Sequence, residues 1–295
     1  MSQLLVSVLM TAFNREQYIG EAIESVLAST YKNLELIIVD DCSTDNTVNI
    51  AKSFSKKDNR VQVYVNEKNL GDYPNRNCAA SYANGTYIKY LDSDDTIYPW
   101  GLEAMMYCML KYPDAGYGLM CHQIDFNNPL PSLLSPEDTY RKYFFYGSLL
   151  GMGPSGAIIK RSAFNKVTGF SGIPYIGDIE IWLRLSQKEK LVCMPGNLVW
   201  WREHEGQQIK QETKFKDFEK LKLLTYKNLL IDKDCPLNNS DACIAIRNQI
   251  NIRSRNILKQ ILQFRFRTAL STAYMFNVKF SDLIKSTKKN QVPIE

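Results

Sequence analysis

Acidic side chains follow two apolar runs of the sequence, at the point where each run ends. They are Asp40 and Asp41 after residues 34–39, and Asp92, Asp94 and Asp95 after residues 86–91. Five carboxylates brought close together repel one another and raise one another's pKa values unless a cation or a set of donors compensates them. Alternate carboxylates on an extended segment suit Mn²⁺ or Mg²⁺, which also bind phosphate oxygens. The pattern predicts a metal-bound nucleotide, although a bare Asp-x-Asp triplet also occurs in turns.

Strand patterns and helix patterns alternate through the first hundred residues, and they position these acids. Apolar or alternating runs predict strands at 4–10, 34–39, 61–65 and 86–91, and helical spacing predicts helices at 16–27, 45–54 and 75–83. Ser43 is the expected N-cap of the second helix. Strands that alternate with helices predict an α/β fold with a parallel sheet covered on both faces. The carboxyl ends of such strands share one edge, where an open α/β sheet binds its ligand.

Several enzyme classes are disfavoured because the sequence lacks their motifs. The first predicted strand continues as TAFNRE, with neither GxGxxG nor GxxxxGK[ST], so a dinucleotide oxidoreductase or a P-loop NTPase would lack its phosphate-binding loop. There is no GxSxG motif, and the chain has only two histidines, His122 and His204. A histidine-based hydrolase is therefore disfavoured, and we interpret His122 as structural.

Three segments in order resemble the family 2 glycosyltransferases of the GT-A fold. They read VLMTAFN at 8–14, VDDCSTDNT at 39–47 and YIKYLDSDDTIYP at 87–99, and Asn69-Leu70-Gly71 with residues 75–80 resembles the family's intervening NxG and ARNxG-like segment. The resemblance covers residues 4 to about 204. It implies a Rossmann-like mixed sheet flanked by helices. The departures are Thr11-Ala12-Phe13-Asn14 in place of Pro-x-Tyr-Asn, and Pro74-Asn75 in place of small residues before Arg76.

The resemblance also implies roles in binding a nucleotide-sugar donor. Asp41 would accept a hydrogen bond from the base, and a carboxylate can accept the N3 proton of uracil or thymine, so the expected donor is a UDP-sugar or a dTDP-sugar. Asp94 would bind Mn²⁺ or Mg²⁺ on the diphosphate, where the metal stabilises the leaving group. The other implied donor-site residues are Thr11, Ala12, Phe13, Asn14, Arg76, Asp92 and Ser93. Alternatively, Asp40 and Asp95 cap helices and Arg76 is a surface charge.

The segment GIPYIGDIEIWLRL at 172–185 resembles the family's ED-x-x-L-W-x-R segment. The resemblance implies that Asp178 is the general base that takes the proton of the attacking hydroxyl, with Glu180 as the reserve candidate. Gly177 stands where the family usually has Glu. One base without an enzymic nucleophile implies inversion at the anomeric carbon. The alternative interpretation is that Asp178 caps the following helix.

Two further segments resemble the family. Gly153-Pro154-Ser155-Gly156-Ala157 would lie under the acceptor pocket, with Ser155 and Gly156 lining it, although a glycine-rich turn has the same letters. The segment from Trp200 to Gln207 resembles an end piece in which the histidine approaches the metal or the diphosphate, which makes His204 a candidate ligand. A solvated surface histidine is the alternative.

Charge and composition divide the 295 residues at about 204–210. Residues 205–295 carry 17 Lys and Arg against 9 Asp and Glu, whereas residues 1–204 are net acidic. We expect a catalytic domain at 1–204, with a donor half at about 1–99 and an acceptor half at about 100–204, followed by a basic helical extension at 205–295. Helices are expected at 212–231 and from about 241, and the basic amphipathic stretch 253–267 favours contact of residues 241–285 with an anionic membrane. Packing on the catalytic domain or dimerisation would give the same periodicity.

The preferred hypothesis is a metal-dependent, inverting sugar transferase that extends a surface polysaccharide on a glycan or polyprenyl-linked acceptor. The alternatives are a catalytically silent assembly subunit that binds nucleotide-sugar or glycan, and a nucleotidyltransferase. Nucleic acid is not an expected partner, because no zinc, helix-turn-helix or RRM motif accompanies the basic tail. No secretory signal and no apolar run of membrane-spanning length is evident, so we expect a cytoplasmic protein, with peripheral contact on the inner face of the cytoplasmic membrane and oligomerisation as further hypotheses.

Overall fold

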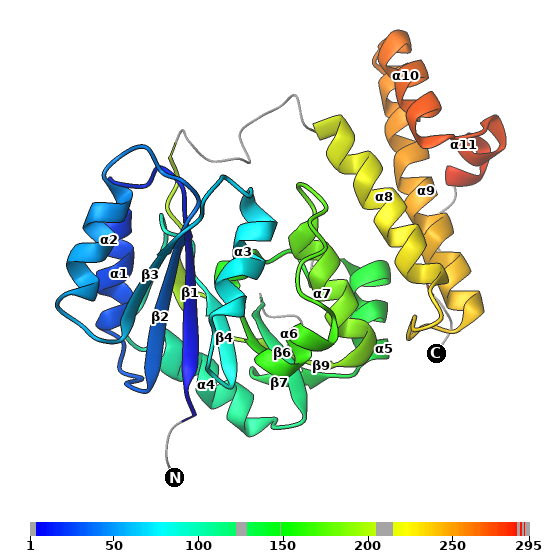
Figure 1. Ribbon diagram of the computed structural model, residues 1–295. Helices are drawn as coiled ribbons and strands as arrows, with labels where there is room; N and C mark the ends of the chain where they lie inside the picture. The colour runs from blue at the N-terminus through cyan, green and yellow to red at the C-terminus, as the bar shows by residue number, and fades with distance from the viewer. Residues whose placement is uncertain are drawn as a thin grey trace. The chain divides into compact units, whose positions relative to one another are not determined.

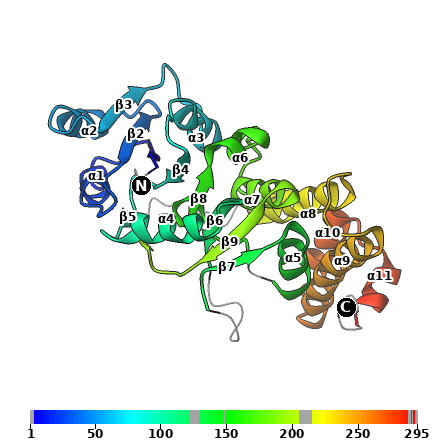
Figure 2. The same cartoon turned by 90° about the horizontal axis from the view of Figure 1, so that it is seen from below.

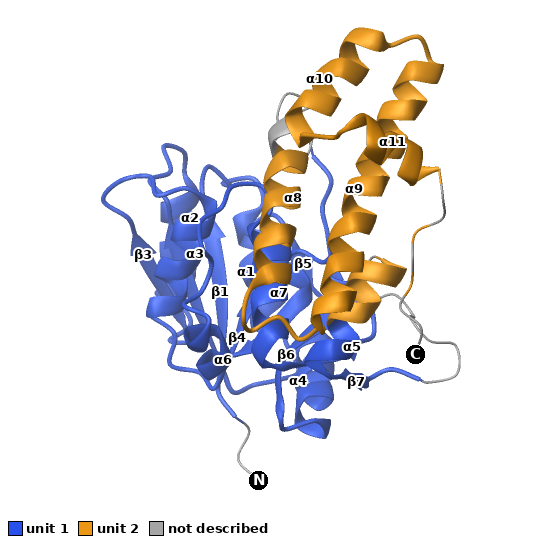
Figure 3. Cartoon of the chain, turned by 90° about the vertical axis from the view of Figure 1, so that its right-hand side faces the viewer, with its two compact units in different colours: residues 1–139, 148–210 blue, residues 140–147, 211–295 orange. Residues whose placement is uncertain are grey.

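A computed structural model describes residues 4–121, 129–147, 149–204, 215–287, 290 and 292 (Figure 1). The chain forms two compact units, one of residues 1–139 and 148–210 and the other of residues 140–147 and 211–295 (Figure 3). His122 and most of the expected junction at 204–210 lie outside the described residues. Residues 140–147, within the range expected for the acceptor half, group with the C-terminal helices.

The first unit is built on an eight-stranded mixed sheet with the order β3-β2-β1-β4-β8-β6-β9-β7. Its strands are β1 (Val6–Ala12), β2 (Leu34–Asp40), β3 (Val61–Val65), β4 (Tyr87–Tyr90), β6 (Ala115–Met120), β7 (Ser132–Leu134), β8 (Ala157–Lys160) and β9 (Lys190–Met194). The strands β3, β2, β1 and β4 are parallel, whereas β8 runs antiparallel to both β4 and β6. The expected parallel arrangement therefore holds for the first half of the sheet, and the whole sheet is mixed.

Helices cover both faces of this sheet (Figures 1 and 2). One face carries α1 (Ile19–Leu27), α2 (Thr47–Ser55) and α4 (Gly101–Lys111), and the other carries α3 (Asp72–Ser81), α6 (Arg161–Lys166) and α7 (Gly177–Lys188). This cover buries β1 and β2 almost completely, which is why both read as continuous apolar runs rather than alternating ones. The smaller elements are β5 (Thr96–Ile97), which pairs with β10 (Val199–Trp200), and α5 (Pro136–Arg141), η1 (Lys142–Tyr146) and η2 (Pro154–Gly156).

The element boundaries differ from the expected ones by a few residues. The helix α3 starts at Asp72 rather than Asn75, because Pro74 falls in its first turn, where a proline is tolerated. The helix α2 starts at Thr47, and Ser43 is not its cap. The Asp45 carboxylate accepts the Thr47 N–H at 3.0 Å instead, while the Ser43 hydroxyl donates to Asp40.

The second unit is helical. Its helices are α8 (Phe215–Ile231), α9 (Asn239–Leu262), α10 (Phe266–Phe276) and α11 (Phe280–Ser286). The Asn238 side chain caps α9 by accepting the Asp241 N–H at 2.9 Å, and Arg141 donates to the Asp241 carboxylate at 2.6 Å. The stretch 253–267 is not one helix, because α9 ends at Leu262 and Phe264 has a positive φ of 57°. No helix in the described ranges is both long and apolar enough to cross a bilayer.

Candidate active site

The loops after β1 and β2 meet at the carboxyl edge of the sheet. The Asn14 N–H donates to the Ser43 hydroxyl at 2.8 Å, and the Asn14 side-chain oxygen accepts the Thr44 N–H at 2.9 Å. Asn14 adopts a left-handed φ of 52°, which asparagine tolerates better than most residues. Thr11 and Ala12 end β1, and the Phe13 ring that follows is 45% exposed. An exposed ring at a strand end can stack on a planar ligand.

Asp41 is buried and held by the segment between β3 and α3. Its carboxylate accepts the Leu70 N–H at 2.8 Å, the Gly71 N–H at 2.9 Å and the Asn66 amide at 2.8 Å. A carboxylate has about four acceptor positions, so these three bonds orient the group and leave capacity for one more donor. The neighbouring Asp40 instead bonds the Ser43 backbone and hydroxyl.

Arg76 is a buried cation that lies in a cluster with partly buried acids from three different segments. Its Nη1 is 2.8 Å from Asp92 Oδ1, and its Nε donates to Asp72 at 2.8 Å. Arg76 is only 7% exposed, so it is not the surface charge that the sequence left open. Its positive charge also acts on Asp178, at the start of α7. The cluster therefore joins one acid of the Asp92-Ser93-Asp94 triplet to the candidate base.

Asp178 lies in the first turn of α7. The N-cap of that helix is Ile176, so the structure contradicts the alternative interpretation of Asp178 as the capping residue. Burial raises the pKa of Asp178 to about 7; Arg76 and a hydrogen bond from the Tyr73 side chain oppose the shift, whereas Asp72 and Asp92 add to it. A carboxylate with a pKa near neutrality is suited to accept a proton at physiological pH.

Glu180, the reserve candidate, has different surroundings. Its side chain pairs with Arg184 at 3.3 Å in an i,i+4 arrangement and is only 5% exposed. Burial raises its pKa, and Arg184 and Ser171 oppose the shift. These contacts account for Glu180 as a structural residue that fixes α7.

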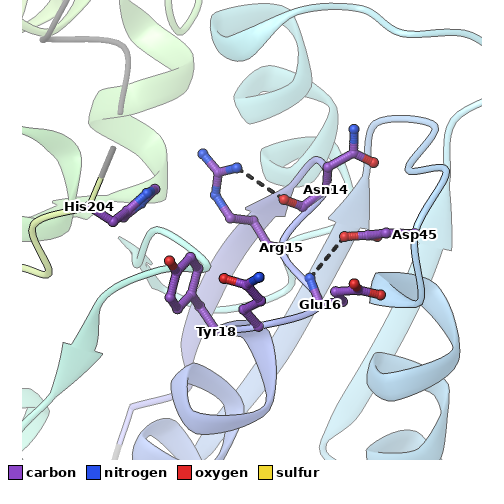
Figure 4. Close-up of a pocket in the computed structure, with 7 residues that line it drawn as sticks. Asn14, Arg15, Glu16, Tyr18, Asp45 and His204 are labelled. Carbon is purple, nitrogen blue, oxygen red and sulfur yellow. Dashed lines mark hydrogen bonds between the residues drawn. The ribbon is translucent and has the colours of Figure 1, made fainter. Parts of the chain in front are cut away.

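Asp94 and His204 meet at the same edge of the sheet. His204 Nε2 is 3.0 Å from Asp94 Oδ2, and Arg15 Nε donates to the same oxygen at 3.1 Å. The His204 ring packs on Tyr18 with 4.8 Å between ring centroids. Residues 14–18, Asp45 and His204 line an open pocket of about 580 Å³ (Figure 4). The structure thus places an imidazole, a guanidinium and a carboxylate beside a space large enough for a phosphate group.

Asp94 contacts two residues that line this pocket, Arg15 and His204, and with His204 it forms a donor pair that fits a divalent metal shared with a phosphate ligand. No group of three or more His, Cys, Asp or Glu side chains in the described part of the chain could hold a metal ion. Asp94 and His204 supply one oxygen and one nitrogen donor side by side. Mg²⁺ and Mn²⁺ are commonly held by one or two protein ligands with substrate phosphates completing the shell, rather than by an all-protein cage. Ser93 between the two acids is 3% exposed.

Ser155 connects the acceptor side of the sheet to the acidic loop. Its hydroxyl accepts the Asp92 N–H at 3.0 Å, and its carbonyl accepts a hydrogen bond from Lys89 Nζ. Gly156 is packed so tightly against Met152 that a Cβ at this position would lie 2.2 Å from the Met152 Cγ. Ser155 and Gly156 are both buried, so they support the acidic loop from behind and expose almost no surface of their own.

Three side chains at this site were missed by the sequence analysis. Arg15 lies next to Asn14 in the same loop, and its position one residue beyond an expected ligand-binding segment was the available signal. Tyr73 contacts Asp178 from α3. Lys89 is a fully buried lysine in β4 that donates to the Tyr90 and Ser155 carbonyls, and burial lowers its pKa to about 7. The signal for Lys89 in the sequence was the presence of a lysine within the apolar run 86–91.

Comparison with known proteins agrees with this fold and arrangement. Residues 7–168 match the family model described as Glycosyl transferase family 2. The chain therefore belongs to glycosyl transferase family 2, and the resemblance found in the sequence is confirmed. With its mixed sheet and covering helices, it is a glycosyltransferase of the GT-A fold.

Relatives and solved structures extend the match beyond that range. An uncharacterized glycosyltransferase of Haemophilus influenzae is 26% identical over 88% of this chain and 84% of its own length. The Escherichia coli UDP-Glc:alpha-D-GlcNAc-diphosphoundecaprenol beta-1,3-glucosyltransferase WfgD is 29% identical over 75% of this chain and 85% of its own. The structure of S. aureus TarS 1-349 in complex with UDP-GlcNAc has a TM-score of 0.67 at 17% identity, covering 96% of this chain and 79% of that one. A Pyrobaculum calidifontis mannosyltransferase structure with GDP-Man and Mn²⁺ has a TM-score of 0.62 at 14% identity, covering 98% of this chain and 88% of that one.

Proposed function

We propose that the protein is an inverting, metal-dependent glycosyltransferase of surface polysaccharide biosynthesis. It transfers a sugar from a UDP-sugar, or a dTDP-sugar, to a hydroxyl group of a glycan or a lipid-linked oligosaccharide. The observation that carries the proposal is the Arg76 cluster, which connects Asp92 of the triplet with Asp178 through one buried cation. The relation to WfgD, which by its name acts on a diphosphoundecaprenol-linked sugar, supports the lipid-linked class of acceptor.

The donor half of the site binds the nucleotide. Asp41, held by three donors, has one acceptor position left for the N3 proton of uracil or thymine. Thr11, Ala12 and Phe13 line the base and ribose, and Asn14 holds their loop against Thr44. Asp94 and His204 would hold Mn²⁺ or Mg²⁺, which when bound neutralises the charge of the diphosphate. Arg15 adds a second positive charge to this pocket.

The acceptor half carries out the proton transfer. The Asp178 carboxylate accepts the proton of the acceptor hydroxyl while that oxygen forms a bond to the anomeric carbon. The bond from the anomeric carbon to the diphosphate oxygen breaks, and its electron pair leaves with the nucleoside diphosphate. Attack from the side opposite the leaving group inverts the configuration. Ser155 keeps the Asp92 backbone in place beside this reaction.

The experiment compares Asp178→Asn with Glu180→Gln in a UDP-release assay. The donors are UDP-Glc, UDP-GlcNAc and UDP-Gal, each with Mn²⁺ and with a diphospholipid-linked GlcNAc of short chain as acceptor. We expect Asp178→Asn to lower kcat at least about 100-fold, because general-base catalysis contributes about 10²–10⁴-fold, and to leave the Kd for UDP within about two-fold. Glu180→Gln should retain most of the activity.

Three results would overturn the proposal. Loss of activity in Glu180→Gln with an active Asp178→Asn would move the base to Glu180. Pyrophosphate release in place of UDP release would identify a nucleotidyltransferase. Binding of UDP without turnover of any of these donors by the wild-type protein would indicate an assembly subunit that only binds the nucleotide-sugar.

A further inference from the structure

Large apolar side chains are unusually exposed at one end of the helical unit. They follow the end of α9 and continue through α10 and α11, two helices that both pack against α9 (Figure 3). These side chains are Leu262, Phe264, Phe266, Leu270, Tyr274, Phe280 and Ile284, which we call the apolar tip. Isolated exposed apolar residues are ordinary, but a contiguous group of this kind marks an interaction surface.

The periodicity of α10 shows that the exposure belongs to a defined helix face. Phe266, Leu270 and Tyr274 follow one another at i, i+4 and i+8, and they are 58%, 75% and 92% exposed. Ala269, on another face of the same helix, is 3% exposed. Residues at this spacing form a stripe along a helix. Phe280 and Ile284 repeat the i, i+4 spacing on α11, with 77% and 60% exposure.

Basic side chains are interleaved with the apolar tip. Residues 259–287 contain five Lys or Arg and a single acidic residue, Asp282. All five are exposed: Lys259, Arg265, Arg267, Lys279 and Lys285. Asp282 is occupied as a helix cap, because its carboxylate accepts the Lys279 N–H at 2.9 Å. The tip therefore presents apolar and aromatic side chains in a field of positive charge.

We propose that the apolar tip docks on the surface of a bilayer that contains anionic lipid. Aromatic and aliphatic side chains on a short helix enter the boundary between headgroups and acyl chains, while Lys and Arg contact anionic headgroups. A second copy of the chain is the less fitting occupant, because a two-fold interface would bring the same positively charged patch against itself. Nucleic acid would match the charge, but it would leave Leu270 and the aliphatic Ile284 of α11 without an apolar environment.

This proposal narrows the segment 241–285 that the sequence suggested for membrane contact. The middle of α9 supports the unit, since Arg253, Ser254 and Ile257 are at most 4% exposed. Arg253 Nη2 pairs with Glu219 of α8 at 3.1 Å, and its guanidinium lies 5.4 Å from the Phe276 ring. These contacts use α9 for internal packing, so the docking surface begins only at Leu262.

The test measures cosedimentation of the full chain with vesicles of phosphatidylcholine alone and of phosphatidylcholine with 30% phosphatidylglycerol. We expect binding to the anionic vesicles, at least ten-fold weaker binding to the neutral ones, and weakening by 0.5 M NaCl. The combined substitutions Phe266→Ser, Leu270→Ser and Tyr274→Ser should lower the affinity at least ten-fold. Arg265→Gln with Arg267→Gln should lower it mainly for anionic vesicles. Tyr107→Ser with Leu110→Ser, at exposed positions of α4 in the other unit, is the matched control and should bind as the wild type does.

The substituted side chains lie on an exposed face, so far-UV circular dichroism and the Tm should not change, and retained UDP binding would confirm that the protein is intact. Equal binding by wild type and the α10 triple variant would overturn the proposal. So would a concentration-dependent dimer in light scattering that the triple variant abolishes, or binding of a duplex RNA probe without any vesicle binding. Vesicle binding needs neither donor nor Asp178, so this result is independent of the proposed sugar transfer.

Discussion

His204 Nε2 lies 3.0 Å from Asp94 Oδ2, although 110 residues separate the two in the chain. The contact forms because β10, just before His204, pairs with β5, just after Asp94. Arg202 strengthens the same connection, since its N–H donates to Asp95 at 3.2 Å and its Nε donates to the Asp94 carbonyl at 3.1 Å. The segment after β10 thus closes over the acidic loop that follows β4.

Asp94→Asn should abolish the metal dependence of nucleotide binding. In the wild type, UDP with Mn²⁺ should raise the Tm by mass action more than UDP alone. The variant keeps the shape of the side chain but loses the charge that would bind the cation, so we expect the affinity for UDP with Mn²⁺ to fall at least about ten-fold. His204→Gln should have a smaller effect, and EDTA should remove the effect of Mn²⁺ in the wild type.

Asp114→Asn is the matched control for that experiment, because Asp114 is an exposed acid that pairs with a surface lysine, Lys190. It should respond to UDP and Mn²⁺ as the wild type does. A wild-type protein that binds UDP equally well with and without Mn²⁺ would contradict the assignment of Asp94. A Tm response to GDP alone would contradict the assignment of Asp41.

The pH profile of kcat/KM should show an acidic limb that belongs to Asp178. The base must be charged to accept a proton, so activity should rise as the pH increases through the pKa of about 7 and should be lost below it. Tyr73→Phe removes a hydrogen bond that lowers this pKa, and the limb should therefore move to higher pH. Steady-state rates measured between pH 5.5 and 9 test this.

Tyr64→Phe is the control for the tyrosine substitution. Tyr64 donates to Gln62 on β3 and stacks on Tyr82, so removing its hydroxyl should leave the limb unchanged. A shift to lower pH in Tyr73→Phe, or no acidic limb between pH 5.5 and 8 in the wild type, would show that Asp178 does not titrate as proposed.

Gly177→Ala should destabilise the protein and reduce its activity. A Cβ at this position would lie 2.5 Å from Cζ of the Tyr73 ring, which stacks on Phe170 with 5.3 Å between centroids. Overpacking of this kind lowers the free energy of unfolding by about 1–3 kcal/mol. It also displaces the backbone at position 177, next to Asp178. Chemical unfolding and kcat measure the two effects.

Gly20→Ala is a suitable comparison, because a Cβ there meets only the Ile50 methyl at an ordinary distance of 3.8 Å. At the second position of α1 it should be neutral or slightly stabilising. If the clash with Tyr73 is the cause, Tyr73→Ala should cost less in the Gly177→Ala background than in the wild type. Additive effects of the two substitutions would rule the clash out.

Arg76→Gln should be among the most destabilising single changes at the site. It removes a buried cation that faces Asp72, Asp92 and Asp178. Because Asp72 and Asp92 are partly exposed to solvent, the loss should lie below about 3–5 kcal/mol, the cost for a fully buried pair. Arg60→Gln breaks a partly exposed pair with Asp58 and should cost less than about 1 kcal/mol. Urea unfolding at pH 7.5 distinguishes them, and similar losses for both variants would mean that the Arg76 cluster is not a coupled charge network.

The sequence by itself determined the class and much of the donor side. The patterns of residues 34–39 and 61–65 match β2 and β3 within one residue. The first is apolar throughout because β2 is buried on both faces, and the second alternates because β3 is a partly exposed strand at the end of the sheet. The order of the acidic segments was enough to predict the family and the edge at which Asp41 and Asp94 lie. The roles of these residues remain predictions, since the structure gives their positions and contacts.

The tertiary structure decided what depends on contacts between distant segments. Packing between elements far apart in sequence accounts for three features of the site. Arg76 is buried between acids, Tyr73 occupies the space beside Gly177, and His204 reaches Asp94. The same holds for the tail, where periodicity predicted one basic amphipathic stretch at 253–267. The turn at Phe264 separates the end of α9, where Arg253, Ser254 and Ile257 are buried, from the exposed start of α10. Helical spacing defines which residues share a face, but only the packed neighbours determine which face is covered.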